Sequence, residues 1–194
     1  ARARAAIDAG LVIANDRPVS KASEVIPADA VLQAQPAHPW VSRGGIKLAH
    51  ALEEFAIDVT GAVAMDVGSS TGGFTDVLLS KGAFRVFAVD SGTNQLAWKL
   101  RQDPGVIVHE QTSARILTAE HIPELVDLIV CDASFIGMQM VLDMPLRLCA
   151  PGAWAVALIK PQFEAGPGQV GKGGVVRDPR VLQPGHLGGD VRAL

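Results

Sequence analysis

One stretch in the first half of the chain limits the fold more than any other. Residues 63–67 alternate apolar side chains and predict a buried strand, and apolar spacing resumes at Phe74, Val77 and Leu78, as in a helix. Between them, residues 68–73 form a loop of small residues bounded by glycines. A loop of this kind lets backbone N–H groups and a helix N-terminus approach a ligand closely. The stretch therefore predicts an α/β fold with a binding loop.

An acidic residue ends the second strand, at an informative sequence separation from the glycine loop. Residues 84–89 predict that strand, and Asp90 ends it roughly 20 residues beyond the loop, where nucleotide-binding α/β folds hydrogen-bond a ribose. The loop lacks the middle glycine of the dinucleotide fingerprint, which disfavours a NAD-dependent oxidoreductase. With Asp66 before it, the loop resembles the first motif of class I S-adenosylmethionine methyltransferases, whose cofactor has a ribose but no phosphate. A tight turn without a ligand is the simpler alternative.

Strands and helices continue to alternate along the chain. We expect helices at 95–101 and 134–148, and strands at 106–108, 127–132 and 153–159. This order predicts a doubly wound, mostly parallel sheet, in which ligands bind beyond the carboxyl ends of the strands. Four polar side chains fall at or near such ends, and we expect them on one rim: Asp66, Asp90, Asp132 and Lys160.

Composition limits the class of protein. The 194 residues, 48% of them hydrophobic, suffice for one ordinary domain and a small appendage. No apolar run reaches the ~18 residues of a membrane span, and no secretory signal is recognised. Cys131 and Cys149 lie in apolar surroundings, so we expect reduced thiols in a cytoplasmic protein. The net charge of −3 argues against general coating of nucleic acid but allows a local basic patch.

Residues 1–36 differ in character from the rest. They predict a helix closed by Gly10, a hairpin around Asn15 and Asp16, and a short strand at 30–32. This order resembles the alpha-L RNA-binding domain shared with a small-subunit ribosomal protein, although its first helix starts partway through, so we expect a partial α+β domain. The resemblance implies RNA contacts at basic residues, for which a solvated charged face is the alternative: Arg2, Arg4, Arg17, Lys21 and, beyond this segment, Arg43.

Pro36 and Pro39 favour extended chain, so residues 37–41 are expected to be a linker. A helix opens at residue 42, and its buried stripe is formed by Leu48, Ala51, Leu52 and Phe55. Lys47 lies at the edge of that stripe. Spacing alone favours a lysine that turns to water, although one at this edge can also reach inward over the sheet.

Several motifs in order carry a specific resemblance. They occupy residues 42–48, 66–76, 95–101, 132–135, 158–164 and 170–179. Together they resemble the TlyA, or hemolysin A, family, which joins an alpha-L domain to an FtsJ-like methyltransferase. The resemblance implies that residues 42–194 form a Rossmann-like class I methyltransferase domain. It also implies S-adenosylmethionine-dependent 2′-O-ribose methylation of ribosomal RNA, alone or in a ribosomal subunit, with no metal and no membrane.

The resemblance also implies which residues form the site. FtsJ-like enzymes use a Lys-Asp-Lys-Glu tetrad, and Lys47, Asp132 and Lys160 match its first three members. A ribose hydroxyl is a weak nucleophile, so Lys160 is expected to orient it and take its proton, with Asp132 holding the geometry. The expected cofactor-binding residues are Asp66, Gly68, Ser69, Ser70, Thr71, Gly72, Gly73, Phe74, Asp90, Gln111, Thr112 and Asp132.

Some features depart from the family pattern. The sequence ends before the tetrad glutamate is expected, and Glu164 is too close to Lys160 to be that residue. Prolines and glycines interrupt the helix expected at 178–194, and Ser113 stands where the family commonly has Asn. We therefore expect a C-terminally truncated sheet, from a fragment or a degenerate member. Two alternatives stay open: a non-catalytic RNA- and cofactor-binding remnant, and a membrane-active hemolysin. The second has little support, because the sequence predicts no clear basic amphipathic helix that would bind a membrane surface.

Overall fold

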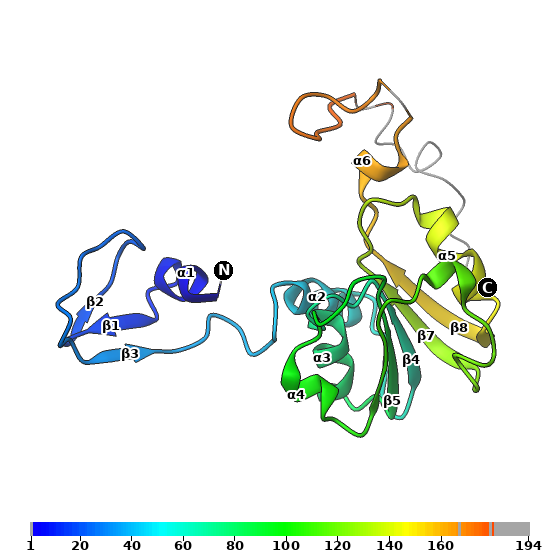
Figure 1. Ribbon diagram of the computed structural model, residues 1–194, viewed down its shortest axis with the longest axis horizontal. Coiled ribbons are helices and arrows are strands. Elements are labelled where there is room, and N and C mark those ends of the chain that lie inside the picture. The colour runs from blue at the N-terminus through cyan, green and yellow to red at the C-terminus, as the bar shows by residue number, and fades with distance from the viewer. Residues whose placement is uncertain (1, 167, 179, 181–194) are drawn as a thin grey trace.

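The computed structural model describes residues 2–166, 168–178 and 180, and its larger part is built on a parallel sheet (Figure 1). The strands lie in the order β6-β5-β4-β7-β8, and each pairs with its neighbours in parallel. Their bounds are β4 (Val63–Val67), β5 (Arg85–Val89), β6 (Val106–His109), β7 (Val126–Cys131) and β8 (Cys149–Ala157). The doubly wound fold expected from the sequence is confirmed.

Helices cover both faces of this sheet (Figure 1). One face carries α2 (Gly44–Glu54), α3 (Gly73–Ser80) and α4 (Trp98–Arg101), and the other carries the 3-10 helix η1 (Ala114–Ile116) and α5 (Met138–Leu146). Consecutive strand residues alternate between the two cores, since Ala64 packs with α2 and α3 while Met65 packs with η1 and α5. Strands buried on both faces explain the nearly continuous apolar runs of the sequence.

The N-terminal part is a small antiparallel sheet in the order β2-β1-β3, preceded by α1 (Arg2–Asp8). Its strands are β1 (Val12–Ala14), β2 (Arg17–Pro18) and β3 (Leu32–Ala34). The predicted hairpin turn is confirmed, with Asn15 at φ 47° and Asp16 at φ 62°. The third strand was expected at 30–32 but begins two residues later. Val31 is instead bonded to the turn, since its amide donates to Asn15 Oδ1 at 2.9 Å.

Three further boundaries correct the sequence prediction. The helix expected at 95–101 begins only at 98, because the amides of residues 94–96 donate to the Glu110 carboxylate. The helix expected at 134–148 begins at 138, after Phe135 in left-handed conformation at φ 67° and an extended Gly137. The strand expected at 153–159 already starts at Cys149, with a register shift that accommodates Pro151 and Gly152.

The last described helix is α6 (Pro161–Glu164), and the interruption predicted at 178–194 lies almost entirely outside the described residues. Within the described part, none of the helices has the length and apolar character needed to span a membrane. Both cysteines are free thiols, with Cys131 buried and Cys149 half-buried.

A buried carboxylate anchors the linker to the larger part. Asp76, on α3, is 8% exposed. Its Oδ2 accepts from the Val41 amide at 2.7 Å and its Oδ1 accepts from Lys99 Nζ at 2.7 Å. The side chain of Trp40 packs against the backbone of Gly45, so closely that a Cβ there would lie 2.5 Å from the indole. Asp76 thus joins the linker, α3 and α4.

Replacing Asp76 by alanine should lower the free energy of unfolding by about 1–3 kcal/mol, because the Val41 amide would lose its acceptor. Urea unfolding measures the effect. Asp143→Ala is the matched control, since Asp143 forms an exposed ion pair with Arg147 that should contribute about 1 kcal/mol or less. Equal losses in the two variants would contradict this account of the linker.

Candidate functional site

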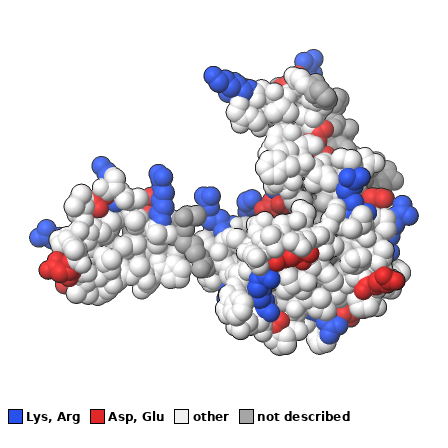
Figure 2. All heavy atoms as spheres, in the orientation of Figure 1, with Lys and Arg blue, Asp and Glu red and all other residues white. Residues whose placement is uncertain are grey.

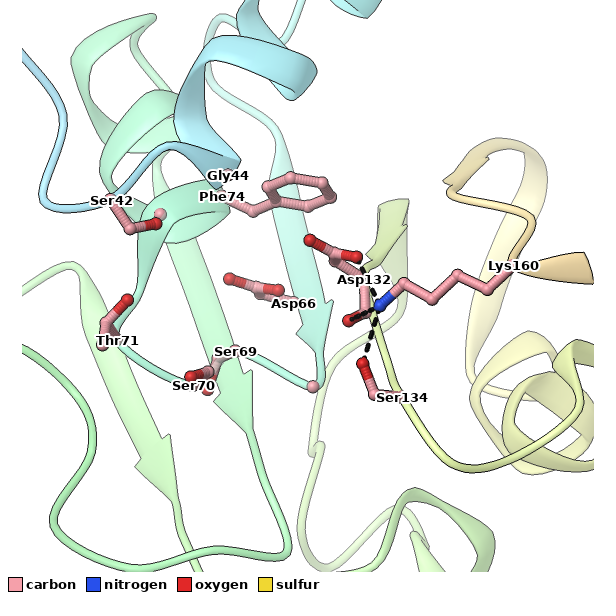
Figure 3. Close-up of a pocket in the computed structure, with 12 residues that line it drawn as sticks. Ser42, Gly44, Asp66, Ser69, Ser70, Thr71, Phe74, Asp132, Ser134 and Lys160 are labelled. Atoms are coloured by element: carbon pink, nitrogen blue, oxygen red, sulfur yellow. Dashed lines mark hydrogen bonds and ion pairs between the residues drawn. The ribbon is translucent and has the colours of Figure 1, made fainter. Parts of the chain in front are cut away.

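Two cavities open at the carboxyl rim of the large sheet, with volumes of about 480 and 240 Å³. Figure 3 shows the smaller one, with Asp132 and Lys160 on one side and the loop after β4 below. The two cavities share part of their lining: Gly68, Ser70, Asp132 and Ser134. They therefore meet where the loop after β4 faces the chain that follows β7.

A carboxylate between two lysines occupies this meeting point. Asp132 Oδ1 lies 2.7 Å from Lys160 Nζ in an ion pair. Lys160 Nζ also donates to the Asp132 carbonyl at 2.9 Å and to Ser134 Oγ at 2.8 Å. Asp132 Oδ2 lies 3.4 Å from Lys47 Nζ. The expected approach of Lys160 to Asp132 is thus present, and three oxygens lie within 2.9 Å of Lys160 Nζ.

Fold topology explains why these residues meet. Asp132 directly follows β7 and Lys160 follows β8, and these strands are adjacent and parallel, with Cys131 paired with Ala157. Lys47 comes from α2, and its side chain is 53% exposed although its ammonium reaches Asp132. Spacing alone favoured a Lys47 that turns to water, and the structure shows a half-exposed side chain whose ammonium also reaches inward over the rim to Asp132.

Asp90 holds the glycine loop against the second strand. Its Oδ2 accepts from the Ser70 amide and its Oδ1 from the Gly92 amide, both at 2.7 Å. Ser70 Oγ donates to Gln95 Oε1 at 3.0 Å, so the loops after β4 and β5 are joined. Asp90 also lines the larger cavity, and each of its oxygens keeps a second lone pair for a ligand.

The glycines of the loop serve different purposes. Gly68 lines both cavities at φ 79°, and a Cβ there would lie 2.9 Å from the Ala133 Cα, so only glycine fits. Gly72 lines neither cavity. At φ 89°, its missing Cβ leaves room for Leu100 of α4, which would otherwise be 2.3 Å away. Gly72 was expected to bind the cofactor; the structure shows that α4 needs this glycine for its packing, and the cofactor role stays a prediction.

The other expected cofactor residues divide between the cavities. The smaller cavity is lined by Asp66, Ser69, Thr71, Gly73 and Phe74, and the larger by Asp90 and Thr112. Gln111 lines neither, and its amide donates to the Gly92 carbonyl at 2.9 Å. The lining residues that the sequence did not single out include Ser42 and Gly44 in the smaller cavity, and Gln95, Ala114, Phe135, Ile136 and Val141 in the larger.

Phe135 is prominent among the residues that the sequence analysis missed. It borders the larger cavity, is 91% exposed, and its ring lies 5.2 Å from that of Phe163. A non-glycine residue at positive φ is held there by its surroundings and often marks a functional site. Phe135 belongs to the motif 132–135, but the expected helix from 134 hid the loop that exposes its ring.

Asp66 lies buried beneath the smaller cavity. It is 1% exposed, and its Oδ2 accepts from the Thr75 amide at 2.9 Å and from the Thr75 hydroxyl at 2.7 Å. Burial raises the pKa of Asp66 from its ordinary value of 3.8 to about 7, and the charges of Asp132 and Asp90 add to this effect, against the Thr75 hydrogen bonds. Burial likewise raises the pKa of the Cys131 thiol to about 11, so this thiol stays protonated at neutral pH.

The raised pKa of Asp66 predicts a specific pH dependence. Between about pH 4 and pH 7 the folded protein holds a proton on Asp66 that the unfolded chain has released, so stability falls as pH rises through this window. Asp66→Asn mimics the protonated form. The fall in unfolding free energy across this pH window should therefore be about 2–4 kcal/mol smaller in the variant than in the wild-type protein. Urea unfolding of both proteins at pH 4.5 and 7.5 gives the difference. Parallel pH profiles would contradict the burial of an ionisable Asp66.

Four of the five basic residues expected to contact RNA are exposed. Arg4, Arg17, Lys21 and Arg43 are exposed, and Arg2 begins α1. Arg4 Nε lies 3.9 Å from Asp8 Oδ2 in an exposed ion pair, a contact of little energetic weight. In the face seen in Figure 2, the Lys and Arg atoms of the N-terminal part form separate groups.

Comparisons with known proteins agree with this geometry. The family model described as FtsJ-like methyltransferase matches residues 40–187. The chain is 46% identical over 93% of its length to Bacillus subtilis YqxC, described as a candidate rRNA methyltransferase, and 56% identical over 73% to the 16S/23S rRNA (cytidine-2′-O)-methyltransferase TlyA of Mycobacterium tuberculosis. It spans 65% and 53% of these relatives' lengths.

A solved structure from Streptococcus thermophilus, described as a candidate hemolysin, shares the fold. It superposes with a TM-score of 0.74 at 41% identity, covering 92% of this chain and 66% of that one.

Proposed function

Because the chain belongs to the FtsJ-like methyltransferase family, we propose that it transfers a methyl group from S-adenosylmethionine to a ribose 2′-hydroxyl of ribosomal RNA. The observation that carries this proposal is the contact of Asp132 with both Lys47 and Lys160 where the two cavities meet. The names of the relatives support ribosomal RNA as the substrate class. A ribosomal substrate would place the reaction in the cytoplasm.

The larger cavity fits the nucleoside part of the cofactor. Its apolar wall, made by Ala114, Ile136 and Val141, suits an adenine ring, and Asp90 offers carboxylate oxygens to ribose hydroxyls. A dinucleotide fits less well, because a pyrophosphate needs free loop amides. The amides of Gly68, Ser69, Ser70 and Gly72 already donate to protein acceptors.

The smaller cavity would hold the reacting groups. The bound cofactor supplies a methyl group on a positively charged sulfur. The ribose oxygen would form a bond to that methyl as the carbon–sulfur bond breaks, and the hydroxyl would give up its proton. The sequence led us to expect Lys160 as the proton acceptor. Because three oxygens already lie within 2.9 Å of its Nζ, we assign it instead to orienting the ribose oxygen and stabilising the developing negative charge. Asp132 is the carboxylate nearest to Lys160 that could receive the proton, directly or through water.

RNA contacts are assigned to two places. Phe135 presents an exposed ring at the edge of the larger cavity, and single-stranded bases commonly stack on such aromatic rings. The exposed basic residues of segment 1–36, proposed as a partial RNA-binding domain, and Arg43 would hold phosphates. Both assignments are consistent with a chain whose net charge is only −3, since they need local contacts and not a basic surface throughout.

One observation supports a second candidate, a cofactor- and RNA-binding protein without catalysis. Glu164 is the glutamate nearest to Lys160 in sequence, and it bonds the Met138 amide at 2.7 Å instead of joining Asp132 and the lysines. It therefore does not supply the fourth charged group of the FtsJ-like tetrad. Cofactor binding without methyl transfer by the complete protein that carries this sequence would favour this candidate.

Cofactor binding can be tested at Asp90. Asp90→Ala should weaken S-adenosylmethionine binding by about 1–3 kcal/mol, because a carboxylate acceptor for the ribose is lost. Titration calorimetry measures the affinity, and NAD serves as the competing ligand class. Asp127→Ala is a matched control, because Asp127 also accepts a backbone amide, from Val63 at 2.9 Å, outside both cavities. Unchanged affinity in a folded Asp90→Ala protein would exclude this assignment.

Methyl transfer can be tested at Lys160. In the complete protein, Lys160→Ala should lower turnover on ribosomal RNA by about 10²–10³-fold while cofactor affinity is retained, since the lost ammonium would contact the acceptor and not the nucleoside. Transfer is followed with a radiolabelled methyl group, and the exposed Lys81→Ala is the control. Wild-type turnover by the Lys160→Ala protein would contradict the proposed chemistry.

A further inference from the structure

Two chain segments run beside each other at the acceptor side of the site and touch at successive points. One is the loop 132–138 between β7 and α5, and the other is the segment 160–164 after β8. Lys160 contacts Asp132 and Ser134, the Phe163 ring packs against the Phe135 ring, and Glu164 bonds Met138. The contacts follow the same order in both segments, so the second segment holds the first along its length.

Glu164 closes this series at the start of a helix. Its Oε1 accepts from the amide of Met138, the first residue of α5, at 2.7 Å. Gly137 precedes that residue and has no side chain that could cap the helix, so a carboxylate 26 residues further along the chain takes that place. A negative charge there is favoured by both the free amide and the helix dipole.

The loop needs such support because of the conformation of Phe135. Its φ of 67° is unfavourable for a residue with a side chain, and its ring is 91% exposed, so little of its own burial holds it. The flanking contacts lie at Lys160 on one side and at Glu164 on the other. Lys160 lines the smaller cavity, where the proposed ribose hydroxyl would compete with its present partners, whereas Glu164 lies outside both cavity linings and could keep its bond throughout.

We propose that Glu164 is a positioning residue for the methyl acceptor. It acts through the Met138 amide to keep Phe135 and Ser134 placed for the incoming nucleotide, and it does not touch the reacting atoms. This inference rests on the proposed function, because the acceptor is the ribose of an RNA. It gives a role to a glutamate that the family pattern leaves without one in this sequence.

The test compares Glu164→Ala with Glu164→Gln, since the glutamine amide oxygen can still accept from Met138. In the complete protein, Glu164→Ala should lower kcat/KM for RNA by roughly tenfold to a hundredfold, as expected for a misplaced acceptor, with unchanged affinity for S-adenosylmethionine. Glu164→Gln should restore most of that loss. Glu53→Ala, an exposed change of the same charge on α2, should behave as wild type.

A second measurement does not depend on activity. Hydrogen exchange of the Met138 amide and of amides in loop 132–137 should accelerate in Glu164→Ala, while amides of loop 68–73 keep their rates. The proposal is overturned if this exchange is unchanged, if kcat/KM of an active protein is unaffected, if cofactor affinity falls in parallel, or if Glu164→Gln is as impaired as Glu164→Ala. Absence of methyl transfer by the wild-type protein would instead contradict the proposed function. Accelerated exchange in Glu164→Ala would then show only a structural role for Glu164, so the proposal of a positioning role would also be overturned.

Discussion

The site depends on one carboxylate that holds two ammonium groups. Lys47 and Lys160 are far apart in the sequence but close together in the fold. Two positive charges at this separation repel each other unless a negative charge lies between them. Asp132 supplies that charge, with Oδ1 2.7 Å from Lys160 and Oδ2 3.4 Å from Lys47. The arrangement needs β7 and β8 to be adjacent and parallel, because only then do both chains leave the sheet at the same edge.

The remaining parts of the rim are arranged around this contact. The buried sheet fixes the direction of each strand, and the small residues after β4 let the loop pass close to Ala133, directly after Asp132. Asp90 ties that loop to β5 through the Ser70 amide. Glu110 then holds the loop after β5, because three backbone amides of residues 94–96 donate to its carboxylate. Arg101 and these amides lower the pKa of Glu110 to about 2, so Glu110 stays charged across the physiological pH range. The cavities are therefore bounded by loops that are bonded to one another.

The sequence predicted those parts of the structure that depend on local pattern. Short apolar runs, alternating in β4 and nearly continuous in β7, located β4, β5 and β7, and the polar residues at or after the ends of these strands met on one rim as expected. The direction of Lys47 was not predictable in this way, because a lysine at a helix edge turns inward or outward according to a partner far along the chain. The packing role of Gly72 was not predictable for a similar reason: a loop glycine needed by Leu100 has the same local pattern as one needed by a cofactor. Phe135 was missed because apolar spacing from 134 onward suits a helix, and only the positive φ and Gly137 show where the helix begins.

A crystal structure with S-adenosylhomocysteine tests the central claim most directly, that the two cavities form one methyl-transfer site joined at Asp132. The account predicts adenine in the larger cavity beside Ile136 and Val141, ribose hydroxyls on Asp90, and the sulfur at the shared boundary between Gly68 and Ser134, facing Lys160. A ligand bound outside these cavities, or one whose sulfur points away from Asp132 and Lys160, would contradict it.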